Sequence, residues 1–232
     1  MNYLETFTAI QSHNLAPPRF TLPGAVPIDQ ETLVGLHYHK DYLTPYWDPE
    51  AGYRLDATYA TGIPIFGEQE SFNLWEGQLS FVKSLPDSLG WLSETRLAAR
   101  VFAAVGLPTN GEYFPLGGGD LCRGFDLKER QGSLVWVGSL EWRVPLARGL
   151  KWDVVDHAAG LRNIYAAAFY DVGDAYVNGH PVGDVAHALG AGLRLDVSWF
   201  GFVERTILRV DVAKTINASS PVQVWVGVQQ PF

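Results

Sequence analysis

Residues 133–146 read SLVWVGSLEWRVPL, and two kinds of side chain alternate along the whole stretch. One set is apolar apart from a glycine: Leu134, Trp136, Gly138, Leu140, Trp142, Val144 and Leu146. The other set carries the polar side chains: Ser133, Val135, Val137, Ser139, Glu141, Arg143 and Pro145. Because side chains alternate between the two faces of a strand, this pattern predicts one long β-strand with an apolar and a polar face. The predicted strand is longer than the roughly 5–6 residues typical of strands in soluble sheets, and longer than the roughly 9–11 residues that cross a bilayer at a tilt.

The same two-residue period recurs along most of the chain, between clusters of Gly, Pro, Asp and Asn. The further segments that show it are 31–42, 52–61, 71–83, 91–105, 163–176, 189–199, 206–213 and 222–229. The sequence therefore predicts about nine strands, and a doubtful tenth near the N-terminus. Residues 1–30 are expected to form an irregular lead-in or a partial strand, and residues 31–232 a single β domain.

Alternation alone does not say which face of each strand meets water, so a soluble β-sandwich also fits the pattern. Two features favour a transmembrane barrel. Opposite charges occur together on the polar faces, as a packed polar lumen requires: Arg194 with Asp196, Arg209 with Asp211, and Glu141 with Arg143. Aromatic residues gather near strand ends, where barrels have interfacial girdles: Tyr42, Tyr46, Trp47, Trp91, Trp199, Phe200, Phe202 and Phe232. The predicted fold class is all-β, an antiparallel transmembrane β-barrel or part of one.

The composition narrows the classes of partner. The chain has 232 residues, of which 47% are hydrophobic, and a formal net charge of -8, which argues against nucleic acid as a partner. No stretch approaches the roughly 18 consecutive apolar residues of a spanning helix, so a membrane would be crossed by strands. A mean hydropathy of -0.00 fits a barrel, because lipid-facing and lumen-facing residues cancel. The first residues do not resemble a secretory signal, so either the signal was removed or Met1 starts a fragment.

The longest connection, residues 106–132, carries the most specific motif. It contains GGGDLCRGF, in which three glycines precede Arg123, Gly124 and Phe125. This resembles the lumen-loop motif of the BamA/TamA superfamily of outer-membrane assembly and translocation proteins, also called the bacterial surface antigen family. In that family a long loop folds back into the barrel, and the arginine at its tip pairs with acidic lumen residues.

Further segments resemble the same family in the same order. Glu141 lies in SLEWRVPL, which resembles the strand after the loop, and Asp171 lies in AAAFYDVGDAY, which resembles the next strand. The chain ends in VWVGVQQPF, which resembles the C-terminal strand that is read as an assembly signal. Gly227 and Phe232 match its glycine and terminal aromatic positions, and Gln230 departs from the second aromatic position.

The resemblance implies that the loop is locked to the barrel wall, and simple electrostatics supports this. An arginine in a lumen of low dielectric keeps its charge and needs carboxylate partners. We therefore expect Arg123 to bond to Asp171, Glu141 or both. Gly124 is expected to let the backbone turn sharply, and Phe125 to wedge the loop tip against the wall. The alternative is a surface turn whose arginine contacts nothing.

Other chemistry-bearing residues are interpreted as structural. His37 and His39 would project both imidazoles from one side of a strand, a spacing that can bind metal, but no third ligand is evident. Asp156 and His157 lie in a polar connection, and no serine is placed convincingly to serve them. Cys122 is interpreted as a small apolar filler beside the arginine. We expect no catalytic residue, no metal site and no cofactor.

The resemblance also implies a function. The family barrel has sixteen strands, of which this chain would supply about the last nine or ten. The implied role is non-enzymatic: it assists assembly or transport of proteins at a bacterial or organelle outer membrane, through a weak seam whose C-terminal side would be residues 221–232. The implied partners are outer-membrane lipid, and client or partner outer-membrane proteins.

Two alternatives remain open at this point. The barrel could anchor a larger protein whose enzymatic or binding domain lies N-terminal, or it could be a small structural barrel without a transport role. We expect that these residues alone do not close a normal barrel, because about nine strands leave edges that hydrocarbon cannot satisfy. A missing N-terminal portion, a second copy or a partner chain would then complete it.

Overall fold

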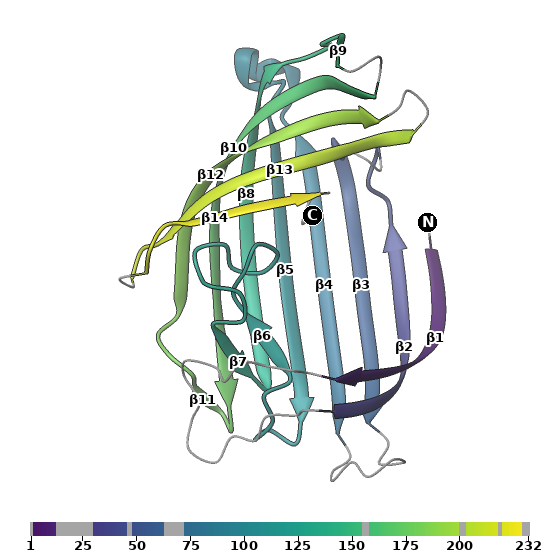
Figure 1. The fold of residues 1–232 in the computed structure, drawn as a ribbon, viewed down its shortest axis with the longest axis vertical. Coiled ribbons are helices and arrows are strands. Elements are labelled where there is room, and N and C mark those ends of the chain that lie inside the picture. Colours follow the sequence, from purple (N-terminus) through teal and green to yellow (C-terminus); the bar gives the residue numbers. More distant parts are fainter. Residues whose placement is uncertain are drawn as a thin grey trace.

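The computed structural model describes residues 2–12, 30–45, 48–62, 72–154, 158–199, 203–217 and 220–228, and it consists almost entirely of antiparallel strands (Figure 1). Ten strands follow one another across a single sheet: β1 (Asn2–Ser12), β2 (Gln30–Asp41), β3 (Ala51–Gly62), β4 (Asn73–Ser84), β5 (Arg96–Leu107), β8 (Leu134–Ala147), β10 (Ala159–Val177), β12 (Ala186–Trp199), β13 (Val203–Thr215) and β14 (Gln223–Val228). Two short strands, β9 (Trp152–Val154) and β11 (His180–Pro181), pair with β10. A short 3-10 helix, η1 (Asp87–Leu92), precedes β5.

Each strand presents charged or small side chains to one face of the sheet and large apolar side chains to the other. On β5, Arg96 and Arg100 are buried on the inner face, whereas Leu97, Val101 and Val105 are exposed on the outer face. The same alternation brings further apolar side chains to the exposed outer face: Leu36, Leu79, Phe81, Leu140, Leu189, Leu193, Val212, Val224 and Val226. A broad exposed apolar surface of this kind is typical of a sheet whose outer face meets lipid.

The sandwich alternative is therefore wrong, because a sandwich needs two sheets whose apolar faces meet. Here the principal sheet is single, and the faces that it buries carry the charges. No helix among the described residues is long and apolar enough to cross a membrane.

The N-terminal segment is more regular than the sequence indicated. Residues Asn2–Ser12 form a complete strand that pairs with β2 from Asn2 opposite Lys40 to Ser12 opposite Gln30. The doubtful tenth strand is thus part of the sheet. The rest of the expected lead-in, residues 13–29, lies outside the described residues.

The sheet is strongly curled but does not close within the described residues. In Figure 1 β1 lies at one edge, and β13 and β14 pass in front of the middle strands. The ladders run from β1 to β14 without one that joins β14 to β1. The prediction that these residues do not close on themselves is confirmed for the part of the chain that the structure describes.

The long connection between β5 and β8 lies against the inner face of the sheet. Its base is a two-stranded hairpin, β6 (Phe114–Leu116) with β7 (Arg130–Gly132). Leu116 and Phe125 of this connection are buried in the largest apolar cluster of the described residues, together with wall residues of β5, β8, β10 and β12: Phe102, Ala104, Val135, Val137, Ala175, Val177, Ala186 and Ala188. The loop thus has its own apolar attachment, which positions its tip against the charged part of the wall.

The lumen-loop lock as candidate functional site

The candidate site is the tip of this loop and the wall that it contacts. The loop was predicted over residues 106–132, and β5 ends at Leu107 while β8 begins at Leu134. Leu116 pairs with Arg130 at the end of the hairpin, so the tip is the segment between them. Because the hairpin fixes both ends of the tip, the geometry of the tip depends on its own backbone.

The glycine run allows the tip to fold compactly. Gly117 and Gly118 have φ values of 112° and 100°, a left-handed region that other residues rarely adopt. Gly119 has a different role, because a Cβ there would lie 3.3 Å from the indole ring of Trp225 on β14. Two of the three glycines therefore serve the turn, and the third lets the last strand approach.

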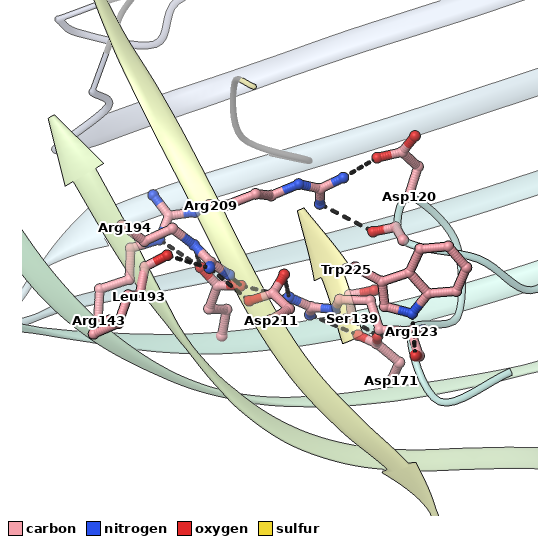
Figure 2. A network of polar contacts seen from close by, with 12 residues as sticks. Asp120, Arg123, Ser139, Arg143, Asp171, Leu193, Arg194, Arg209, Asp211 and Trp225 are labelled. Carbon is pink, nitrogen blue, oxygen red and sulfur yellow. Dashed lines mark hydrogen bonds and ion pairs between the residues drawn. The ribbon is translucent and has the colours of Figure 1, made fainter. Parts of the chain in front are cut away.

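Arg123 is almost completely buried and makes several charge-assisted hydrogen bonds (Figure 2). Its Nε and Nη2 donate to the two carboxylate oxygens of Asp171, at 2.8 and 2.9 Å, and its backbone N–H donates to the same group at 3.1 Å. Its Nη1 donates to Glu141 Oε2 at 2.8 Å. The guanidinium also lies over the ring of Phe169, 3.3 Å from its centroid. Both carboxylates named from the sequence thus contact Arg123, and the pair with Asp171 has the bidentate geometry that only arginine provides.

Glu141 is the centre of a larger group that we call the buried charge cluster. It comprises three arginines and three carboxylates, each at most 2% exposed: Arg123, Arg143, Arg194, Glu141, Asp171 and Asp211. Glu141 accepts from Arg143 Nε at 2.7 Å and from Arg194 Nη2 at 2.7 Å, besides Arg123. Arg194 Nη1 also donates to Asp211 at 2.6 Å. Within these six residues three positive and three negative charges balance, which offsets part of the cost of burying them.

The opposite charges that the sequence placed together on the polar faces are all buried on the inner face, but two residues that are close in sequence do not always pair. Glu141 pairs with Arg143 of its own strand. Arg194 pairs with Glu141 and Asp211 rather than with Asp196. Side chains of several strands converge on the inner side of a curled sheet, so Arg194 on β12 reaches carboxylates of β8 and β13 there.

Arg209 and Asp211 also share the inner face, but Arg209 takes its partners from the loop. Arg209 reaches the loop tip instead, where its Nη1 donates to the Gly119 carbonyl at 2.9 Å and its Nη2 contacts the Asp120 carboxylate. Asp196 pairs with Arg205 and accepts from Asn163 Nδ2 at 2.6 Å. Each of these partners lies on another segment, so the pairing depends on how the sheet and the loop come together.

Gly124 is required at the tip for a reason different from the sharp turn expected. The φ angle of Gly124 is not positive, so its backbone conformation does not require glycine. A Cβ at this position, however, would lie 2.5 Å from Ala188 Cβ and 3.1 Å from backbone atoms of Lys214 and Thr215. The tip therefore touches β12 and β13 so closely that a side chain does not fit. Phe125 and Cys122 are both buried in the apolar cluster beside it, consistent with the roles of wedge and filler.

Substitution of Gly124 by alanine should loosen the loop by overpacking. The added Cβ must displace Ala188 or the backbone of β13, and overpacking of this kind typically costs about 1–3 kcal/mol. Urea unfolding of the detergent-folded protein should show this loss of unfolding free energy. A matched control is Gly77→Ala on β4, where the nearest atom to a Cβ is 4.0 Å away and no loss is expected. Equal stability of the two variants would contradict the close approach.

The last strand is fastened to the loop tip by contacts that sequence reasoning missed. Trp225 Nε1 donates to the Arg123 carbonyl at 2.7 Å, and Gln223 Nε2 donates to Asp126 Oδ1 at 2.6 Å. Gly227 lies opposite Arg209, and a Cβ there would lie 2.6 Å from Arg209 Nε. The three β14 residues share the inner face of the strand. The alternation of the sequence predicted that these three residues share one face of the strand, but it did not predict that this face contacts the loop tip.

The remaining positions named from the sequence are placed as follows. Gly227 is explained by the space that Arg209 needs, and Phe232 lies outside the described residues. Asp156 and His157 also lie outside them. The structure therefore joins Arg123, Gly124, Phe125, Glu141 and Asp171 in one site, and it extends the site to Asp211, Trp225 and Gln223.

Two comparisons with known proteins bear on the identity of this chain. Comparison with curated proteins finds no match. The model of the Omp85 superfamily domain, which describes a family of outer-membrane proteins that insert or translocate proteins, matches residues 27–219 and so covers the loop, the wall and most strands. Since the match spans most of the chain, and since the long loop with its buried arginine lies within it, the chain belongs to the Omp85 superfamily.

Proposed function

We propose that this chain forms the C-terminal part of an outer-membrane barrel that assists the assembly or transport of other proteins, without catalysing a chemical reaction. Its partners in this role are outer-membrane lipid, client proteins of the same membrane, and the segment or second copy that completes the barrel. Family membership supports the general role. The observation that carries the specific proposal is the double attachment of the loop tip, to the wall through Arg123 and to the edge strand through Trp225.

Because the loop tip is bonded to both the wall and β14, the position of the loop constrains the position of β14. On one side the tip is held by Asp171 and Glu141 of β10 and β8, and on the other side it holds β14. In the described residues β14 pairs with β13 alone, so its second edge presents unpaired backbone groups. An edge of this kind is a template for adding a strand, which is how a client strand would engage. The lock would keep that edge in the conformation that receives the client.

The proposal is tested by reconstitution. The chain, with whatever completes its barrel, is placed in liposomes, and the initial folding rate of a urea-denatured outer-membrane barrel is followed by its heat-modifiable mobility on gels. We expect the protein to accelerate folding over empty liposomes. Trp225→Phe removes one hydrogen-bond donor worth about 0.5–1.5 kcal/mol and should slow the assisted rate by about 2-fold to 10-fold. The control is Trp152→Phe on β9, which is exposed and lies at the opposite end of the sheet from β6 and β7 (Figure 1).

The outcomes separate the proposal from its alternative. Acceleration that Trp225→Phe reduces and Trp152→Phe does not would support control of the edge by the loop. A client folding rate equal to that of empty liposomes would contradict the proposed role. In that case the barrel would act as a membrane anchor for an N-terminal domain, whose own activity would be unaffected by either variant.

Integration into the membrane gives a simpler expectation. The outer face carries exposed apolar side chains over its whole width, and a Lys or Arg near the middle of such a face would cost about 2–4 kcal/mol in a bilayer. The protein should therefore stay in the membrane pellet after carbonate or high-salt washing and dissolve only in detergent. Val101→Arg, at the middle of β5, should reduce the folded fraction in the membrane, while Lys83→Arg at the strand end should not. Recovery of the unmodified protein as a soluble monomer would rule out this placement.

A further inference from the structure

A second group of polar side chains lies on the inner face, away from the buried charge cluster. It consists of His37 and His39 on β2 and Asp56 on β3. One nitrogen of each imidazole and one carboxylate oxygen lie within 4.8 Å of one another. The sequence showed no third ligand for the two histidines because Asp56 belongs to the next strand, and only the register of β2 with β3 brings it near.

The strand register explains why the three groups converge. Residues two apart on a strand share a face, so the two imidazoles lie side by side, with ring centroids 6.4 Å apart and planes 22° apart. Asp56 is directly opposite His39 and diagonal to His37. Its Oδ1 is 2.6 Å from His39 Nδ1 and 3.7 Å from His37 Nε2. A single carboxylate oxygen thus faces one nitrogen of each histidine.

The outer nitrogens of both histidines face groups that can accept a hydrogen bond. His37 Nδ1 is 2.9 Å from Thr58 Oγ1. His39 Nε2 is 3.9 Å from Asp41 Oδ2, and Arg54 holds this Asp41 oxygen at 2.9 and 2.8 Å. Metal-binding histidines almost always donate their second N–H to such a partner, which fixes the tautomer and the ring orientation. The surroundings of His37 therefore match those of a histidine ligand, and Asp41 would become the partner of His39 by approaching from 3.9 Å to hydrogen-bond distance.

The charge around the group also favours a cation. In the buried charge cluster each carboxylate faces a guanidinium, whereas the ion pairs of Asp56 among the described residues are with the two imidazoles. Glu5 of β1 lies directly opposite His37 and adds a further negative charge to this part of the wall. Tyr3 stacks on the His39 ring at 4.8 Å and shields one side of the group.

We propose that His37 Nε2, His39 Nδ1 and Asp56 bind a divalent transition metal, Zn²⁺ being the best fit, and that this metal ties β2 to β3. Two imidazoles and one carboxylate form a common zinc ligand set, and water takes the fourth position. With metal–ligand distances of about 2.0–2.2 Å, tetrahedral ligands lie about 3.3–3.5 Å apart. The 3.7 Å separation of His37 from Asp56 is close to this value, and the 2.6 Å hydrogen bond of His39 opens by less than about 1 Å. The two imidazole nitrogens lie within 4.8 Å of each other and approach by at most about 1.5 Å, through rotation of the side chains. His39 then carries its proton on Nε2, facing Asp41.

The metal site is tested on the untagged chain, folded in detergent and freed of metal by a chelator. Co²⁺ is the probe, because its visible absorption reports both binding and tetrahedral geometry, and Zn²⁺ is then added to displace it. We expect one Co²⁺ per chain, with tetrahedral bands that Zn²⁺ abolishes. His37→Gln, His39→Gln and Asp56→Asn should each weaken binding at least about 100-fold, because loss of an outer partner alone costs about 10-fold to 100-fold.

Two further variants make the result decisive. Thr58→Val keeps the shape of the side chain and removes only the partner of His37, so it should weaken Co²⁺ binding by about 10-fold to 100-fold without unfolding the sheet. His180→Gln removes an exposed histidine of β11 and should leave binding unchanged. A wild-type chain that binds no Co²⁺, or a chain whose binding is lost with His180→Gln and kept with Asp56→Asn, would overturn the proposal.

Discussion

Replacement of Arg123 by alanine is expected to lower the unfolding free energy of the chain by about 3–5 kcal/mol and to make the loop sensitive to protease. The reason is that Asp171 and Glu141 are both fully buried, so removal of the guanidinium leaves Asp171 without its bidentate partner and Glu141 with two of its three arginines. The loss includes the contact with the Phe169 ring. The loop tip then keeps only its apolar attachment and its contacts with β14.

The measurement is urea unfolding in detergent together with limited proteolysis of the loop. Arg123→Lys should rescue little, because an ammonium group does not reproduce the planar fork that reaches both carboxylates. The control is Arg148→Ala, which removes an arginine 41% exposed and 3.7 Å from Glu94, a surface pair worth about 0–1 kcal/mol. Protease protection and stability that are unchanged in Arg123→Ala would show that the buried bonds do not hold the loop.

Replacement of Glu141 by glutamine is expected to be at least as damaging. Glu141 accepts hydrogen bonds from three arginines, and a neutral amide leaves the buried charge cluster with one excess positive charge. The amide nitrogen also turns a donor toward a guanidinium, which has no acceptor. We expect a loss of about 3–5 kcal/mol or more in unfolding free energy, measured as for Arg123. Glu94→Gln, at an exposed carboxylate, is the matched control.

A double substitution separates charge balance from loss of packing. Arg143→Met removes one positive charge from the cluster and keeps an unbranched side chain in its place. Combined with Glu141→Gln it restores neutrality, so the double variant should be more stable than the sum of the two single losses predicts, by about 0.5–3 kcal/mol. Strict additivity would mean that neutrality of the cluster is not what stabilises it.

The sequence by itself determined the strands and the face to which each side chain points. The period of two is a local property of an extended backbone, so it could be read without knowledge of any neighbour. Asp171 was placed on the polar face and Tyr170 on the other, and in the structure Asp171 is fully buried while Tyr170 is only partly so. The resemblance of the loop and of the next two strands to the BamA/TamA superfamily likewise identified Arg123, Glu141 and Asp171, and the need of a buried arginine for anionic partners supported that choice.

Only the tertiary structure decided which groups meet. Arg194 pairs with Glu141 and Asp211 and not with Asp196 of its own strand, and Trp225 donates to the Arg123 carbonyl. Asp56 contacts both histidines of the neighbouring strand. In each case the partners lie on different strands or on the loop. Such contacts depend on strand register and on the curl of the sheet. Both result from the packing of all strands together, so no short stretch of sequence indicates them.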